Sequence, residues 1–434
     1  MAHGHGHAHD HAAANATVSR TMRRRLALAA LALAVATLAG IVVLWPQGSA
    51  RGQVAKLGLV KHVHEARVER VARGPCRGTQ GGAQKVLCTK VRFRLTQGPD
   101  TGETRTIEFA DDAQAPDLGV GDAVVLAHTP GATPPYDYTY ADRQRRPVLL
   151  WLTIIFAVAV IALGGLRGIG ALVGLGASIV VILQFMLPSM LDGNSPALVA
   201  IVGASAVAFL ALYLANGVNS LTTVALVSTL GALALTVTLA TLFTHLAHFS
   251  GAANEDSLLI GLGTKAVDIR GLVLAGMVLG ALGALDDITV TQASAVAELR
   301  VADPTLSRRQ LYRRGLRIGR DHIASTVNTL ALAYAGASLP LLLLFTLSGQ
   351  SLGAVANGEI VAIEIVATLV GGVGLVAAVP ISTWFAALVA DARAPSRVRR
   401  TRARYRTAGD GPSRNRAPEP VPDLLAPRED DFWG

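Results

Sequence analysis

Long uncharged apolar runs are the feature that most constrains what this chain can fold into. A transmembrane helix needs roughly 20 apolar residues to cross about 30 Å of hydrocarbon, and eight runs of the sequence approach that length. They lie at about residues 26–45, 148–166, 169–188, 197–215, 221–243, 271–292, 325–347 and 361–389. The composition, with 51% hydrophobic and 16% charged residues, is also too apolar for an ordinary soluble domain. The sequence therefore predicts an all-α polytopic membrane protein with about 8 transmembrane helices.

Positive charges predict how the chain is oriented, because lysines and arginines beside a span resist translocation. The basic clusters fall on one side of the eight predicted spans, whereas the short loops of the other side are poor in them. These clusters are the arginines before residue 26, Arg167, seven arginines from Arg300 to Arg320, and the run "RVRRTRARYR". We therefore expect a plasma-membrane protein with both termini cytoplasmic. The net charge of +9 then reflects topology and predicts no nucleic-acid partner.

The first run, residues 26–45, is too long for the apolar part of a signal peptide, which favours an uncleaved anchor. The polar stretch 46–146 that follows is expected outside the membrane. In it, Val91, Phe93 and Leu95 alternate with charged residues, as in a strand with one buried face. Shorter candidate strands, "EARVERVA", "TRTIEFA" and "DAVVLAHT", are separated by turn residues. We expect a small extracytoplasmic β domain of four or five strands, either a barrel or a sandwich.

The remaining organisation is simpler. Residues 1–25 form a cytoplasmic tail rich in His and Arg, residues 147–390 a membrane domain of seven helices, and residues 391–434 a second tail that we expect to be disordered. The two cysteines of the chain, Cys76 and Cys88, lie in the external domain. An external compartment permits a disulfide between them, although two unpaired thiols remain an alternative.

Alternate histidines near the N-terminus form a candidate metal-binding tract: His3, His5, His7, His9 and His11. Short tracts of this kind bind zinc, copper or nickel through imidazole nitrogens. An incidental low-complexity end is the alternative reading. No cofactor is predicted.

Two adjacent carboxylates, Asp286 and Asp287, interrupt the predicted span 271–292. On a helix they point about 100° apart. A charged carboxylate inside the bilayer costs at least about 2.5 kcal/mol, so each must be protonated, paired or hydrated. The alternative is that the helix leaves the membrane near residue 285.

The next span runs antiparallel to this one, so Asp321, His322 and Ser325 should lie at a similar depth to the two aspartates. The candidate substrate or proton pathway comprises Asp287 as the main titrating group, Asp286 coupled to it, and the polar residues Thr291, Ser294, Asn328 and Thr329. Glu364, on the last span, is a further candidate, with an interfacial position or a shared proton with Glu359 as the alternatives.

Four segments carry a resemblance to a known family. They are "GLVLAGMVLGALGALDDITVTQAS", "GLRIGRDHIASTVNTLALAYAGASLPLLLLF", "NGEIVAIEIVATLVGGVGLVAAVPIST" and "DGNSPALVAIV". The stretch from about 165 to 390 resembles the YibE/F family of bacterial multi-spanning membrane proteins. The resemblance places a family aspartate on Asp287, with Asp286 replacing an apolar residue. It also matches family positions with Asn328, Thr329, Glu364 and Pro380. Where many members read Met-Gly-Thr, this chain reads Ala-Ser-Thr.

The sequence contains no His-Glu-x-x-His and no phosphate-binding loop. We therefore expect no enzyme, but a secondary transporter or permease for an ion or small polar solute, coupled to protons through an intramembrane aspartate. Its partners would be the lipid bilayer, that solute, and a further copy of the chain in a homo-oligomer. The alternative is a non-transporting assembly, scaffold or sensing protein whose external domain binds an envelope partner.

Overall fold

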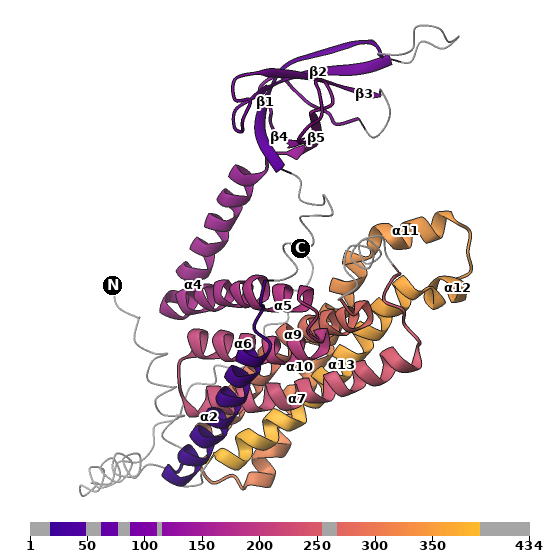
Figure 1. The fold of residues 1–434 in the computed structure, drawn as a ribbon. Coiled ribbons are helices and arrows are strands. Elements are labelled where there is room, and N and C mark those ends of the chain that lie inside the picture. The colour runs from indigo at the N-terminus through magenta and orange to yellow at the C-terminus, as the bar shows by residue number, and fades with distance from the viewer. Residues whose placement is uncertain (1–17, 49–61, 77–86, 111–114, 254–266, 391–434) are drawn as a thin grey trace, which may run out of the picture.

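The computed structural model describes residues 18–48, 62–76, 87–110, 115–253 and 267–390. It is mostly helical, with a separate small sheet domain near the N-terminus (Figure 1). The helices are α2 Arg20–Val43, α4 Arg146–Val181, α5 Leu187–Leu191, α6 Pro196–Asn216, α7 Ser220–Leu246, α9 Ile269–Ala302, α10 Arg308–Ala337, α11 Leu339–Leu347, α12 Leu352–Asn357 and α13 Glu359–Val389. The strands are β1 His62–Pro75, β2 Leu87–Leu95, β3 Thr104–Ala110, β4 Ala123–His128 and β5 Tyr138–Arg143.

Local capping fixes where several helices begin. The Ser19 side chain accepts a hydrogen bond from the Met22 amide at the start of α2, and Asn219 does the same for the Thr222 amide at the start of α7. Ser307 and Gln310 form a reciprocal capping box at the start of α10. Such caps satisfy amides that have no partner within the helix.

Within the described residues, six helices are long and apolar enough to cross a membrane, or seven if the bent pair α10 and α11 is counted as one span. That pair bends by 60° where Ser338 and Pro340 follow the end of α10. The expected count of eight is not confirmed, because predicted spans 148–166 and 169–188 fall within one continuous helical stretch, Arg146–Leu191, of which α4 is the main part. Gly165 interrupts α4 with φ 55° and ψ −135°, and Figure 1 shows two arms that meet at a sharp bend.

The helical core is formed by α6, α7, α9 and α13, with α9 packed against the other three and against α10. Small residues allow this close packing, because the Cβ of an alanine at Gly374 of α13 would overlap the Thr236 hydroxyl of α7. α2 lies against α6 and α7, at the edge of the core (Figure 1). The first arm of α4 is exposed along most of its length.

The two described ends of the helical domain lie together. Val18, before α2, forms a β-bridge with Ala390, after α13. The buried Arg300 at the end of α9 donates to the Leu306 carbonyl at 2.6 Å and to the Ala390 carbonyl at 3.4 Å. The start of α2, the α9–α10 loop and the end of α13 therefore share one side of the bundle.

The opposite side is held by different contacts. Asp192, after α5, accepts hydrogen bonds from the amides of Gln47 and Gly48, which follow α2. Glu359, at the start of α13, accepts from the amides of Ser250 and Gly251, each at 2.7 Å. These two sides define the axis along which α6, α7, α9, α10 and α13 run back and forth.

The sheet domain between α2 and α4, which the sequence predicts to be external and which we call the external domain, is a five-stranded antiparallel sheet in the order β3-β2-β1-β4-β5. All the segments predicted as strands form strands, and "YTYADR" supplies the fifth. Val68, Val91 and Phe93 are among the side chains that fill the core of the sheet. The two edge strands approach each other, so the curled sheet resembles a partly open barrel rather than a sandwich.

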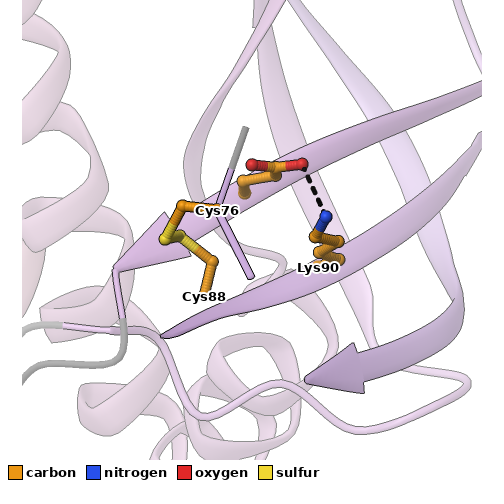
Figure 2. The surroundings of a disulfide bond; sticks show 4 residues. Cys76, Cys88 and Lys90 are labelled. Carbon is orange, nitrogen blue, oxygen red and sulfur yellow. Dashed lines mark ion pairs between the residues drawn. A yellow bond between two sulfur atoms is a disulfide. The ribbon is translucent and has the colours of Figure 1, made fainter. Parts of the chain in front are cut away.

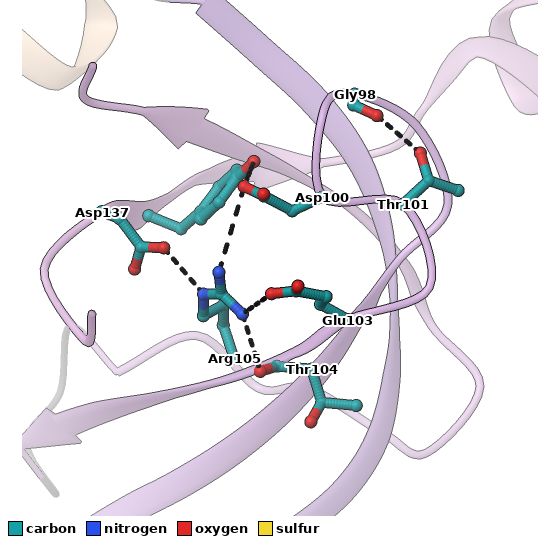
Figure 3. A network of polar contacts seen from close by, with 8 residues as sticks. Gly98, Asp100, Thr101, Glu103, Thr104, Arg105 and Asp137 are labelled. Atoms are coloured by element: carbon teal, nitrogen blue, oxygen red, sulfur yellow. Dashed lines mark hydrogen bonds and ion pairs between the residues drawn. The ribbon is translucent and has the colours of Figure 1, made fainter. Parts of the chain in front are cut away.

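An arginine-centred network joins those edges (Figure 3). Arg105 of β3 donates through Nε to Asp137 Oδ2 at 2.7 Å and through Nη1 to Glu103 Oε2 at 2.6 Å. The hydrogen bonds to these carboxylates, that to Asp137 first, hold the pKa of the guanidinium well above its usual range. The Tyr138 hydroxyl, beneath Arg105, donates to Asp100 Oδ2 at 2.9 Å.

A disulfide joins Cys76 to Cys88 at the far end of β1 and β2 (Figure 2). Two residues after Cys88 on β2, Lys90 pairs with Glu108 of β3 at 3.3 Å. The sequence left open whether the two cysteines pair; in the structure they are bonded.

Candidate functional site

The two aspartates lie near the middle of α9, which runs from Ile269 to Ala302. Asp286 faces α7, where the Thr229 side chain lies against its carboxylate. Thr229 is about 14 Å along α7 from the helix start at Ser220. The polar turn before that start, Asn216 to Asn219, lies instead at the level of Ser294. This difference in level favours a position of the two aspartates inside the span. The alternative, a helix that leaves the membrane near residue 285, is less favoured.

Asp286 occupies a buried polar contact between α7 and α9. The hydroxyls of Thr229 and Thr289 lie 2.6 Å apart, and both side chains are fully buried. Thr289 also donates to the Asp286 backbone carbonyl at 3.1 Å. The carboxylate atom Oδ1 of Asp286 is buried without a hydrogen-bond partner among the described residues. A buried acceptor of this kind is costly unless a proton or cation satisfies it.

Asp287 has the opposite environment. Its side chain is 70% exposed, and its Oδ2 atom lies 4.0 Å from Nε2 of His322 on α10. That imidazole nitrogen has no hydrogen-bond partner among the described residues. An ion pair forms there when the imidazole is protonated, although 4.0 Å is too long for a direct hydrogen bond between the two atoms.

The expected neighbours of Asp287 are only partly assembled. Thr291, Ser325, Asn328 and Thr329 are all exposed, on the same side of α9 and α10 as Asp287. Since the helices are antiparallel and Asp287 lies level with His322, Asn328 lies about 9 Å farther along α10. The predicted site is therefore an extended polar strip and not one compact pocket.

Two candidates, Ser294 and Glu364, lie away from the polar strip. Ser294 faces away from α10 and lines a small cavity with Arg167, Asn216 and Asn219 at one end of α6 and α7. Glu364 lines a cavity of about 240 Å³ with Tyr334 and Ser338 near the other end of α10. Among the described residues, no hydrogen bond joins Glu364 to Glu359, whose carboxylate instead accepts from the amides of Ser250 and Gly251.

Gln292 is a buried polar residue that the sequence reasoning did not place in the site. It lies at the junction of three helices, where its Nε2 donates to the Gly315 carbonyl and to Thr383 Oγ1, each at 2.7 Å. The glycines of α10 make room for it, because a Cβ at Gly319 would lie 2.8 Å from Oε1 of Gln292. The sequence signal for this junction is an amide side chain six residues after Asp286, together with two glycines four residues apart on the next helix, Gly315 and Gly319.

The histidine tract at His3 to His11 and the tail 391–434 lie outside the described residues. Within the part of the chain that the structure describes, no group of three or more His, Cys, Asp or Glu side chains is placed to hold a metal ion.

A bundle of long apolar helices, with acidic groups in the middle of one of them and a separate small sheet domain, defines a multi-pass membrane protein. Residues 152–392 match the family described as YibE/F-like protein. The chain belongs to this family, as the four sequence segments suggested. No curated protein and no solved structure matches the chain.

Proposed function

We propose that this protein is a secondary permease of the bacterial plasma membrane that moves an ion or small polar solute together with protons. The observation that carries the proposal is the pair of neighbouring carboxylates in the middle of α9. One, Asp286, is partly buried, and its Oδ1 atom is buried without a hydrogen-bond partner among the described residues. The other, Asp287, faces His322 across 4.0 Å on an exposed polar strip.

The two environments suit two steps of a transport cycle. Asp287 is accessible and lies beside His322, so it takes up and releases a proton as a solute arrives. Asp286, the residue before Asp287 on α9, faces the buried hydroxyls of Thr229 and Thr289. The two carboxylates lie on adjacent residues in a medium of low dielectric. A negative charge on one therefore raises the free energy of ionising the other. The pair therefore couples an exposed group to a buried one.

A flux assay tests this proposal. Purified full-length protein is placed in liposomes that contain a pH-sensitive dye, and proton entry is driven by an imposed membrane potential. We expect Asp287→Asn and Asp286→Asn each to reduce the flux by about tenfold or more, since a neutral amide cannot carry the proton. Glu298→Gln is the matched control, because Glu298 is an exposed carboxylate farther along the same helix. Flux that is unchanged in both aspartate variants removes the carboxylates from the mechanism.

A second candidate function is favoured by one surface of the external domain. Arg67 stands directly opposite Arg94, and Arg70 directly opposite Arg92, on the exposed face of β1 and β2. Like charges in directly opposed positions destabilise a sheet. Of these four arginines, only Arg94 has an acidic partner among the described residues, Glu69. This basic face suits a domain that binds an anionic polymer of the cell envelope.

Polymer binding is measured with the full chain in nanodiscs, using dextran sulfate as the probe and neutral dextran as the reference. The double variant Arg70→Glu/Arg92→Glu is expected to lose most of the binding, and the wild-type affinity to fall as salt is added. The double variant Arg308→Glu/Arg309→Glu changes the net charge equally at the other end of the molecule. Equal loss in both double variants contradicts a specific basic face.

A further inference from the structure

The small cavity at one end of α6 and α7, which we call the α6–α7 cavity, has an unbalanced charge. Arg167 is the only charged residue of its wall within the part of the chain that the structure describes. Asn216, Asn219, Thr222 and Ser294 supply polar groups, and the rest of the wall is apolar. The Arg167 guanidinium forms no ion pair with any described side chain. A cation in a membrane-spanning stretch is costly unless it is paired or hydrated.

The bend of α4 holds Arg167 at this place. Arg167 follows the bend at Gly165 by two residues. Beyond it, the second arm of α4 packs closely on α6, because a Cβ at Gly170 would overlap the carbonyl oxygen of Leu214. The arginine therefore sits beside the turn between α6 and α7 because two packed helices place it there.

Two hydroxyls of the wall are free to bind a ligand. Ser and Thr side chains within helices often donate to the carbonyl four residues earlier, as Ser228 and Thr241 of α7 do. Thr222 is only 4% exposed, and its hydroxyl makes no hydrogen bond to another described residue. The hydroxyl of Ser294, which is half-buried, also makes none among these residues. Because an unpaired buried hydroxyl is costly, the two groups indicate a polar occupant.

The start of α7 adds to the positive potential of the cavity. The first amides of a helix have no partner within it, and Asn219 accepts from one of them, that of Thr222. The N-terminus of a helix as long as α7, with 27 residues, favours an anion. The nearest carboxylate farther along α9, Glu298, is exposed and lies outside the wall. The cavity therefore attracts negative charge.

The size and depth of the cavity select a small ion. Its volume is about 80 Å³, which is room for one inorganic ion and a little water. Its inner wall includes Ala225 and Val290. These residues lie one helical turn from Thr229 and Asp286, respectively, so the cavity reaches deeper than the turn Asn216 to Asn219. A lipid phosphate at the membrane surface does not reach that depth.

We propose that the α6–α7 cavity binds a small monovalent inorganic anion. The Arg167 guanidinium supplies charged donors, and the hydroxyls of Thr222 and Ser294 supply neutral ones. This site is separate from the exposed strip that carries Asp287. The inference does not depend on transport, since it follows from the charge and the free hydroxyls of the cavity alone.

Nitrate binding to the purified full chain tests the site. Protein in dodecyl maltoside and sodium gluconate is titrated with sodium nitrate at constant ionic strength, and the half-unfolding temperature is recorded, because a ligand of the folded state raises it. We expect a saturable rise in the wild type and an apparent Kd about tenfold or more higher in Arg167→Gln. Arg309→Gln removes an exposed arginine of α10 and is the matched control, with an unchanged Kd. No saturable rise in the wild type, or equal Kd values in Arg167→Gln and the wild type, overturns the proposal.

A second variant tests the hydroxyls without changing the charge. Thr222→Val keeps the shape of the side chain and removes its donor, so the Kd for nitrate should rise by about threefold to tenfold. Thr238→Val is the matched control, because Thr238 is exposed on α7 and donates to the Ala234 carbonyl. Its Kd should stay at the wild-type value. A Kd that is unchanged in Thr222→Val contradicts the proposed ligand set.

A lipid headgroup is the other source of a negative charge, and phosphatidylglycerol added to the detergent distinguishes the two. We expect this lipid to leave the Kd for nitrate of the wild type unchanged. If the lipid instead stabilises the wild type but not Arg167→Gln, and nitrate has no effect, the cavity holds a lipid phosphate and the proposal is wrong. Flux assays of the aspartate variants report separately on transport, so a failed anion site and a failed permease give different results.

Discussion

Asp286 and Asp287 are neighbours in sequence but not in environment. Successive side chains on a helix point about 100° apart, so one carboxylate enters the α7–α9 interface and the other lies on the exposed strip. A single substitution therefore probes only one of two physically different sites. Charge at 286 acts within a packed interior, whereas charge at 287 acts at a surface that a solute, water or a second subunit can reach.

Gln292 offers a test of the buried junction. Gln292→Ala removes two hydrogen bonds to α10 and α13 and leaves a cavity between the three helices. We expect a loss of about 2–3 kcal/mol in stability. The measurement is the temperature of half-unfolding of the purified full chain in detergent. Glu298→Ala, an exposed residue on the same helix, should leave that temperature nearly unchanged, and an equal effect of both variants would contradict the role of the junction.

Tyr138 offers a test of the external domain at high pH. Burial raises the pKa of Tyr138 to about 12, compared with about 10 in an unfolded chain. The folded state therefore keeps this proton longer than the unfolded state does. The resulting stabilisation is fully present below pH about 10 and is lost as the pH rises to about 12.

A difference titration measures that proton directly. Phenolate absorbance in the near ultraviolet is recorded against pH for the wild type and for Tyr138→Phe, and the difference isolates one tyrosine. We expect the difference curve to rise with a midpoint near pH 12. A midpoint at about pH 10, the ordinary value for tyrosine, would show that the hydroxyl is not buried against Asp100.

At the scale of elements, the bend in α4 depends on one glycine. Gly165 has φ 55° and ψ −135°, a conformation that side chains with a Cβ rarely adopt, whereas its neighbour Gly164 keeps helical angles. A Cβ added at either glycine would meet no atom within 4 Å. The two glycines therefore differ in backbone conformation and not in the space available for a side chain.

Gly165→Ala should destabilise the bent helix by about 1–3 kcal/mol, or straighten it. Gly164→Ala should be neutral or stabilising by up to about 1 kcal/mol, because alanine favours a helix. The half-unfolding temperature of each variant provides the comparison. Equal temperatures for the two variants would mean that the bend at Gly165 is not a fixed part of the fold.

The sequence was most informative about elements and least informative about their contacts. Apolar length located the spanning helices, and alternation at Val91, Phe93 and Leu95 located a strand. The bend at Gly165 was not predicted, because "LGGLRG" reads equally as a loop between two spans. The same limit applies to Ser294: the sequence grouped it with Asp287 in the candidate pathway, but only packing shows that it faces α6 and α7. Nothing in the spacing identified Thr229 as the neighbour of Asp286.

At the scale of the whole molecule, the position of the two ends constrains the topology. Val18 pairs with Ala390, and Arg300 binds the Ala390 carbonyl on the same side. Two ends on one side require an even number of crossings between them. If every long helix spans the membrane, this geometry therefore excludes a total of seven crossings. A total of eight crossings agrees with it when the two arms of α4 cross the membrane separately.

Reporter fusions test the orientation that follows from this geometry. Arginines cluster beside the shared side, at Arg20 to Arg25 and Arg308 to Arg320, which favours the cytoplasm there. A fluorescent protein fused before α2 or after residue 390 should fold and fluoresce, since it does so in the cytoplasm. Alkaline phosphatase inserted between β4 and β5, after Gly131, should be active, because its disulfides form only outside. Fluorescence of the fusion at only one of the two ends would require an odd number of crossings, and the first arm of α4 would then lie along the membrane surface instead of spanning it.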